Sequence, residues 1–177
     1  MTPPQRPPRP ARARRAASVL LICGLLPAVV PSLTATAPAQ ASSVYLCNGY
    51  KPCSNAGMSD FGYGAKNDAM YWRMYSGHNC TNYVAYRMIQ AGMSTERPWS
   101  GSGMAYNWGH AMKSITDKVP ALGSVAWWDR NASGAGSSGH VAIVEKIVSD
   151  TEIIISEDSW SGDFHWRRII KDGTTWP

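Results

Sequence analysis

Residues 140–157 have the sequence HVAIVEKIVSDTEIIISE, and this stretch decides the fold. It contains two runs rich in β-branched residues, Val141–Val148 and Glu152–Glu157. The polar segment between them begins with Ser149 and Asp150, residue types that favour turns. Two such runs joined by a tight turn predict an antiparallel β-hairpin.

The hairpin decides which side chains share a face of the sheet. With a two-residue turn formed by the Ser-Asp pair, Ala142 lies opposite Glu157. Alternation then places His140 and Glu157 on one face and Asp158 on the other. The diagonal separation is roughly 7–8 Å, which a long side chain can span. A three-residue turn would reverse this parity and place Asp158 beside His140.

The sequence on either side of the hairpin predicts an α+β fold. Two more β-branched or aromatic runs, Ser124–Trp128 and Phe164–Ile170, predict further strands. Apolar residues recur at helical spacing in three earlier segments. We expect helices from Asn67 to Gly77, from Asn79 to Gly92 and from near Ser102 to Ile115. This order is typical of N-terminal helices packed on a C-terminal antiparallel sheet.

The beginning of the chain has the features of a secretory signal peptide. Residues 1–18 contain five Arg and no acidic residue, residues 18–30 are largely apolar, and Ala39-Gln-Ala41 fits a cleavage site. The apolar run is shorter than the about 20 residues of a membrane span, which disfavours an uncleaved anchor. We expect export by the Sec or the twin-arginine route. The predicted divisions are a signal peptide at 1–41, a disulfide-stapled segment at 42–59 and one domain at 60–177.

The basic pI of the whole chain is no sign of nucleic-acid binding, and we expect no nucleic-acid partner. Five of the 17 Lys and Arg lie within residues 1–41, whereas all 12 Asp and Glu follow residue 41. The basic character of the whole chain therefore belongs to its leader. All eight Trp also follow the leader, and we expect some of them to line a substrate groove. The candidates for that groove are Trp127, Trp128 and Trp160.

Three cysteines follow the leader: Cys47, Cys53 and Cys80. Cys47 and Cys53 enclose a short segment with turn residues, and thiols outside the cell tend to pair, so we predict a disulfide between them. The histidines do not stand at the usual spacing of zinc ligands from these cysteines, so we predict no metal site and no other cofactor. Cys80 is left as a free thiol, which is either buried and inert or kept for chemistry.

Cys80 and His140 form the candidate catalytic pair. Cys80 falls in the first turn of the second expected helix, where backbone N–H groups and the helix dipole stabilise a thiolate and an oxyanion. His140 begins a strand directly after the Gly/Ser-rich segment Asn131–Gly139, which we expect to be a mobile loop, so it suits a general base. Glu157 would orient its imidazole. Among the other histidines, His78 is the rival base.

Three segments of the chain also resemble the signature segments of CHAP domains, the cysteine, histidine-dependent amidohydrolases/peptidases. They are Gly77–Tyr86, Pro120–Trp127 and Gly139–Val144, and the likeness extends over residues 60–170. The resemblance implies a papain-like α+β fold and cleavage of peptidoglycan, either in the stem peptide or at the sugar–peptide amide.

The resemblance also implies roles for individual residues, with Cys80 as nucleophile and His140 as base. In the family an acidic residue or Asn after the histidine strand completes the site, which matches Glu157. Some members have Glu-x-Asn at this place, whereas this chain has Glu157-Asp-Ser159. The outer position of the site therefore departs from that pattern.

We therefore expect a secreted bacterial peptidoglycan hydrolase, extracellular or in the cell wall, that acts as an endopeptidase or an N-acetylmuramoyl-L-alanine amidase. Two alternatives stay open: a catalytically inactive protein that only holds wall polymer, and a secreted cysteine peptidase that acts on proteins or is of NlpC type. We expect a monomer whose partner is peptidoglycan, with no stable membrane association after signal cleavage.

Overall fold

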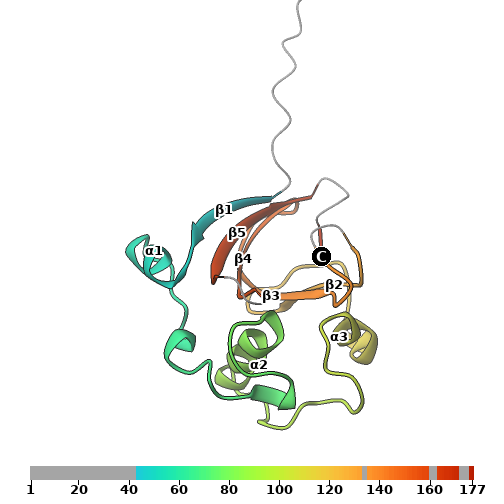
Figure 1. The fold of residues 1–177 in the computed structure, drawn as a ribbon. Helices are drawn as coiled ribbons and strands as arrows, with labels where there is room; N and C mark the ends of the chain where they lie inside the picture. The colour runs from blue at the N-terminus through green and yellow to red at the C-terminus, as the bar shows by residue number, and fades with distance from the viewer. Residues whose placement is uncertain (1–42, 133–134, 160–162, 172–175) are drawn as a thin grey trace, which may run out of the picture. The chain divides into compact units, whose positions relative to one another are not determined.

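The computed structural model describes residues 43–132, 135–159, 163–171 and 176–177 (Figure 1). The leader and Trp160, for both of which the sequence made predictions, lie outside these residues. The strands are β1 Ser43–Asn48, β2 Val125–Trp128, β3 His140–Ser149, β4 Glu152–Glu157 and β5 His165–Ile170. The α-helices are α1 Tyr50–Asn55, α2 Cys80–Gln90 and α3 Tyr106–Ala111, and 3-10 turns span Tyr63–Ala65, Tyr71–Arg73 and Lys113–Ile115. No helix in the described part of the chain is long and apolar enough to cross a bilayer.

The described strands form one antiparallel sheet in the order β1-β5-β4-β3-β2. Strands β2 to β5 agree with the predicted runs to within about one residue, and the α+β class is confirmed. Strand β1 was not predicted. It comes from the segment before the helices and pairs with β5, so that Ser43 lies opposite Ile169 and Cys47 opposite Trp166.

The turn of the β3–β4 hairpin differs from the prediction. Ser149 pairs with Glu152, so the turn residues are Asp150 and Thr151 rather than Ser149 and Asp150. The Ser149 side chain contributes to this turn because its Oγ accepts a hydrogen bond from the Thr151 N–H at 3.2 Å. If the strands continued from this turn without irregularity, each residue of β4 would face a β3 residue two positions later than predicted.

Two irregularities in β3 restore the predicted register at the far end of the hairpin. The pairing shifts by one residue between Ile147 and Ser149, and again between Val144 and Lys146. Each shift places one extra residue on β3, as in a β-bulge. Beyond them Ile143 faces Ser156, which is the register that the sequence analysis assumed. The parity of the next residues, including the candidate site, is therefore as predicted.

The sheet carries an apolar cluster on each face, and the helices cover one of them. Figure 1 shows α2 and α3 lying against the part of the curved sheet that contains β3 and β2. On the helix side, Tyr83 and Val84 of α2 pack with Val141 and Ile143 of β3. The opposite face buries Ala126, Trp128, Ala142, Val144, Ile153, Ile155 and Ile169. Burial on both faces explains the continuous apolar runs in the first half of β3 and in β4, whereas Ile147 and Val148 in the second half of β3 are exposed.

The helix expected between Asn67 and Gly77 is not formed, and only a 3-10 turn is present there. Side-chain hydrogen bonds from α2 replace the helical ones. Asn82 accepts from the Tyr71 N–H at 2.8 Å and donates to the carbonyls of Asn67 and Ala69 at 3.2 and 2.9 Å. The apolar periodicity of this segment was therefore misleading, because several of its backbone groups pair with the distant Asn82 side chain rather than in a helical ladder.

The third helix, α3, begins later than expected. The sequence placed its start near Ser102, but carbonyls at this point accept side-chain hydrogen bonds instead of helical ones. Asn107 Nδ2 donates to the Ser102 carbonyl at 2.7 Å, and Trp108 Nε1 donates to the Gly103 carbonyl at 2.7 Å. After α3 the chain tightens into the 3-10 turn that ends at Ile115.

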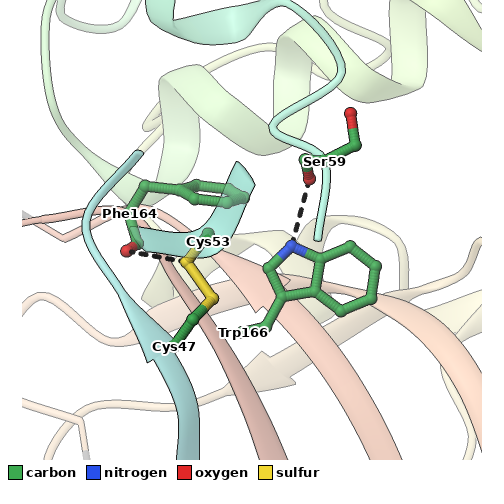
Figure 2. Close-up of a disulfide and its surroundings, with 5 residues drawn as sticks. All are labelled: Cys47, Cys53, Ser59, Phe164 and Trp166. Carbon is green, nitrogen blue, oxygen red and sulfur yellow. Dashed lines mark hydrogen bonds between the residues drawn. A yellow bond between two sulfur atoms is a disulfide. The ribbon is translucent and has the colours of Figure 1, made fainter. Parts of the chain in front are cut away.

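The predicted disulfide between Cys47 and Cys53 is confirmed. It links β1 to α1, and Figure 2 shows it beside Phe164, the residue before β5. Cys53 is fully buried and its sulfur lies 3.9 Å from the Phe164 carbonyl. Trp166 of β5 also donates from its indole N–H to the Ser59 carbonyl at 3.0 Å. The stapled segment is thus tied to the edge of the sheet.

The substitution Cys47→Ser should lower the free energy of unfolding by about 2–4 kcal/mol, because the unfolded chain regains the entropy that the disulfide removes. Urea denaturation of the wild type and the variant would measure this difference. Equal midpoints would show that the sheet edge holds α1 without the covalent link.

Candidate active site

Cys80 is the first residue of α2, and it is the free cysteine of the described residues. Its side chain is partly buried. The helix begins where the sequence predicted, with Asn79 as N-cap. The Asn79 Oδ1 atom accepts from the Asn82 N–H at 2.7 Å and from the Thr81 hydroxyl at 2.9 Å. The cap therefore fixes the position of the first turn, and the N–H groups of Cys80 and Thr81 are first-turn donors that the Asn79 side chain does not use.

The segment before Cys80 is held by the same asparagine. Asn79 is almost fully buried, and its Nδ2 donates to the carbonyls of Tyr75, Ser76 and Gly77 at 3.1, 3.4 and 3.2 Å. One side chain thus satisfies both the start of the helix and the loop that leads into it. This arrangement limits the freedom of the Cys80 sulfur relative to the sheet.

His140 and Glu157 meet across β3 and β4. His140 Nε2 lies 2.6 Å from Glu157 Oε2, and the two side chains are 15% and 2% exposed. The predicted contact between Glu157 and His140 is therefore confirmed, although the catalytic role of each residue stays a prediction. Because Nε2 faces the carboxylate, Nδ1 is the ring nitrogen that remains for Cys80.

The charges of this cluster favour an imidazolium. Burial opposes the charged form of His140, but the Glu157 carboxylate and the nearby Cys80 sulfur outweigh it and raise the pKa of His140 to about 10. Burial likewise opposes ionisation of Glu157, but His140 and then Arg167 outweigh it and hold the pKa of Glu157 below its usual value. The pair is thus a carboxylate and an imidazolium at neutral pH.

Arg167 of β5 is a second cation on Glu157. Its Nη2 donates to Glu157 Oε2 at 2.9 Å, and its Nε lies 2.5 Å from Oε1. Arg167 was not predicted from the sequence. Its charge within the aromatic and β-branched run Phe164–Ile170 could have marked it as a candidate for the site. The β4–β5 register that brings Arg167 to Glu157 could not be predicted from the sequence.

Cys80 and His140 open onto one cavity of about 350 Å³. Its lining residues come from the start of α2, the segment before α3, the loop before β3 and the end of β4. They are Tyr75, Asn79, Cys80, Thr81, Met104, Ala105, Gly136, Ser137, Ser138, Gly139, His140 and Ser159. The hydroxyl and amide side chains among them can hydrogen-bond a peptide-like ligand beside the apolar surface of Met104 and Ala105.

Gly139 fixes the loop that delivers His140. Its φ is +70°, and an added Cβ would lie 2.5 Å from the Tyr106 nitrogen and 2.8 Å from the Trp128 carbonyl oxygen. Glycine is therefore required at this position. The neighbouring Ser138 carbonyl accepts from the Tyr106 N–H at 2.9 Å, which ties the loop to α3. The expected mobility of Asn131–Gly139 stays untested, since residues 133–134 lie outside the described ones.

Two of the three tryptophans expected in the substrate groove, Trp127 and Trp128, are not among the described lining residues of the Cys80 cavity. Trp127 packs against Gly109 of α3 and lines a second cavity of about 480 Å³. Trp128 is buried on the opposite face of β2, with its ring centroid 5.6 Å from that of His140. Neither lines the described part of the Cys80 cavity, because strand alternation directs one beneath the helices and the other into the second core. Trp160 lies outside the described residues.

Asp158 points away from His140, as the predicted parity requires. It is fully buried, and its carboxylate lies 3.5 Å from the Tyr50 hydroxyl and 3.3 Å from His78 Nδ1. Burial raises the pKa of Asp158 to about 6, with His78 and the hydrogen bonds acting in the opposite direction. His78, the rival base, therefore pairs with Asp158 and is not among the lining residues of the Cys80 cavity.

Comparison with known proteins assigns a family. The model of the CHAP domain matches residues 69–159. "Probable autolysin LDP" from Staphylococcus aureus is 33% identical over 100 residues, which are 55% of this chain and 33% of that protein. The N-acetylmuramoyl-L-alanine amidase sle1 from Staphylococcus epidermidis is 34% identical over 102 residues, or 54% and 29% of the two chains.

A crystal structure of an N-acetylmuramoyl-L-alanine amidase from Staphylococcus aureus is 32% identical, with a TM-score of 0.45 over 55% of this chain and 28% of that one. This chain spans about a third of the length of the curated relatives it matches. The family match itself covers just over half of this chain and contains α2 through β4, the elements that carry Cys80, His140 and Glu157. The chain therefore belongs to the CHAP domain family.

Proposed function

We propose that this protein is an exported peptidoglycan hydrolase that cleaves an amide bond of the wall peptide with Cys80 as nucleophile. The observation that carries the proposal is the 2.6 Å contact between His140 and the buried Glu157, beside a cavity that also contains Cys80. The similarity to proteins called autolysin and N-acetylmuramoyl-L-alanine amidase supports the choice of peptidoglycan as substrate.

In the proposed reaction the Cys80 thiolate attacks the carbonyl carbon of the scissile amide. The oxyanion that forms accepts hydrogen bonds from N–H groups at the start of α2, where the helix dipole also favours negative charge. His140 then gives its proton to the leaving amine, and a water molecule that it activates hydrolyses the thioester. Glu157 holds the imidazole in place and stabilises its cation.

The proposed location follows from the leader. Residues 1–41 would direct export and be removed, which places the enzyme outside the cell, at its substrate. The Cys47–Cys53 disulfide fits an oxidising compartment. Digestion of purified peptidoglycan, followed by mass spectrometry of the fragments, would identify the bond that is cut. Fragments from casein instead of peptidoglycan would favour the protein-directed peptidase.

Cys80→Ser should reduce lysis of purified peptidoglycan to background while the fold is retained, because the change removes little volume and leaves a poor nucleophile. Loss of turbidity and thermal unfolding would be measured together. The matched control is Cys47→Ser, which should keep its lytic rate per folded molecule. Undiminished lysis by Cys80→Ser would sink the thiol mechanism, and an inactive wild type that still sediments with peptidoglycan would favour the binding-protein alternative.

Glu157→Gln should lower the lytic rate by roughly 10²-fold, since the amide cannot stabilise the imidazolium. The matched control is Asp158→Asn, the same carboxylate-to-amide change at the next residue. It should retain most of the lytic rate, because Asp158 faces His78 rather than His140. Rates per folded molecule would be compared at pH 7. A larger loss in Asp158→Asn than in Glu157→Gln would contradict the assigned roles.

The pH dependence of lysis should show a fall at high pH. The pKa of His140 is raised from its ordinary 6.5 to about 10, so the proton needed by the leaving amine is present below this pH and is lost as pH rises through it. Rates of peptidoglycan lysis from pH 6 to 11 would measure the midpoint. A fall centred near pH 6.5 would mean that His140 is neutral in the working enzyme.

A further inference from the structure

We propose that Arg167 is a positioning residue of this active site, which keeps Glu157 ionised and directed at His140. The inference rests on the proposed function, because it assigns a role within the same reaction. Arg167 lies beyond the residues 69–159 that the family model matches, and neither the sequence motifs nor the comparisons assign it a role.

Arg167 reaches both oxygens of the Glu157 carboxylate in a fork made of one hydrogen bond, from Nη2, and one ion-pair contact, from Nε, which lacks hydrogen-bond geometry. Nε of Arg167 lies 2.5 Å from Glu157 Oε1, and Nη2 lies 2.9 Å from Oε2. The side chains are 13% and 2% exposed, so water screens the interaction little. Because the two contacts reach different oxygens, they limit rotation of the carboxylate, which a single contact from His140 would leave free to rotate.

The fork also decides which oxygen is available to the imidazole. Oε1 is taken by Nε alone, whereas Oε2 receives both Arg167 Nη2 and His140 Nε2. Rotation of the carboxylate would break one of these contacts. Arg167 therefore holds Glu157 Oε2 in the position in which this oxygen orients His140. Arg167 itself is not among the described residues that line the Cys80 cavity.

Arg167 is in turn held by β1. Its Nη1 donates to the Ser43 hydroxyl at 3.2 Å, and its guanidinium carbon lies 5.6 Å from the centroid of the Tyr45 ring. In the sheet Arg167 lies opposite Tyr45 on one side and Ile155 on the other. Strand β1, which was not predicted from the sequence, thus holds Arg167 in place, and Arg167 in turn holds Glu157.

The charge of Arg167 has a consequence for the acid side of the pH profile. The titratable groups that face Glu157 are His140 from β3 and Arg167 and His165 from β5. Burial lowers the pKa of His165, so this ring contributes little positive charge at neutral pH. Without Arg167, the buried carboxylate keeps one cation, its protonation occurs at higher pH, and a protonated Glu157 no longer stabilises the His140 cation.

The test compares Arg167→Gln and Arg167→Lys with the wild type in lysis of purified peptidoglycan from pH 4 to 11, with rates normalised to folded protein. In Arg167→Gln the acid limb should move to higher pH by about one unit or more, and the basic limb set by His140 should not move to lower pH, because His140 loses a neighbouring cation. Arg167→Lys should keep an acid limb close to that of the wild type because it retains the charge. It should nevertheless lose several-fold in rate at saturating substrate, because an ammonium lacks the fork.

The matched control is Arg168→Gln. Arg168 is the next residue of β5, pairs with Glu152 at 3.7 Å and is more exposed, so its loss should alter neither limb. A merely structural Arg167 would lower the unfolding midpoint and leave the pH profile of the folded protein unchanged, and that result would overturn the proposal. If Arg167→Gln does not fold, a wild-type rate and profile in Arg167→Lys would overturn it equally.

These outcomes are separable from failure of the proposed function. If Cys80→Ser lyses peptidoglycan as well as the wild type, the mechanism itself is wrong. If Cys80→Ser is inactive and the Arg167 variants show wild-type rates and limbs, only the role of Arg167 is wrong.

Discussion

The buried carboxylate of Glu157 is the group on which the arrangement of the site depends. Burying an unpaired carboxylate costs several kcal/mol, whereas here cations approach it from both neighbouring strands. His140 reaches it from β3 and Arg167 from β5, at 2.6 and 2.9 Å from the same oxygen. The His140 contact requires the observed β3–β4 register, and the Arg167 contact requires the observed β4–β5 register. The pairing of the sheet therefore determines which side chains surround Glu157. The two bulges in β3 are part of that constraint, because they bring the hairpin into the register that the contact needs.

A second constraint acts on the other side of the cavity, at the start of α2. Two buried asparagines, Asn79 and Asn82, tie the helix to the preceding loop through its backbone carbonyls and N–H groups. Polar side chains that are fully hydrogen-bonded in this way specify one arrangement, because each alternative leaves a buried group unpaired. The start of α2 that carries Cys80 and the imidazole of His140 are therefore each fixed by a polar network of their own, and both residues line the same cavity.

The sequence predicted those parts of the structure whose signals are local. The β3 and β4 runs, the N-cap of α2 and the disulfide all follow from neighbours in the chain. The helix between Asn67 and Gly77 was wrong because its backbone pairs with Asn82, a tertiary interaction that periodicity does not encode. The predicted turn of the hairpin was also wrong. The predicted register at the site was nevertheless right, because two β-bulges in β3, which the sequence did not predict, offset the error in the turn. Strand β1 and Arg167 were missed because they depend on pairings between distant segments. Trp127 and Trp128 do not line the described part of the Cys80 cavity because strand alternation directs them into opposite cores.

The central claim is that Glu157 maintains His140 as an imidazolium beside Cys80. Nitrogen NMR of the assigned His140 ring, followed over pH, tests this directly because the nitrogen shifts report protonation of each ring atom. We predict that both ring nitrogens stay protonated through neutral pH and titrate with a midpoint at about 10, and that the midpoint falls when Glu157 is replaced by Gln. A midpoint near the ordinary 6.5 in the wild type, unchanged in Glu157→Gln, would contradict the account.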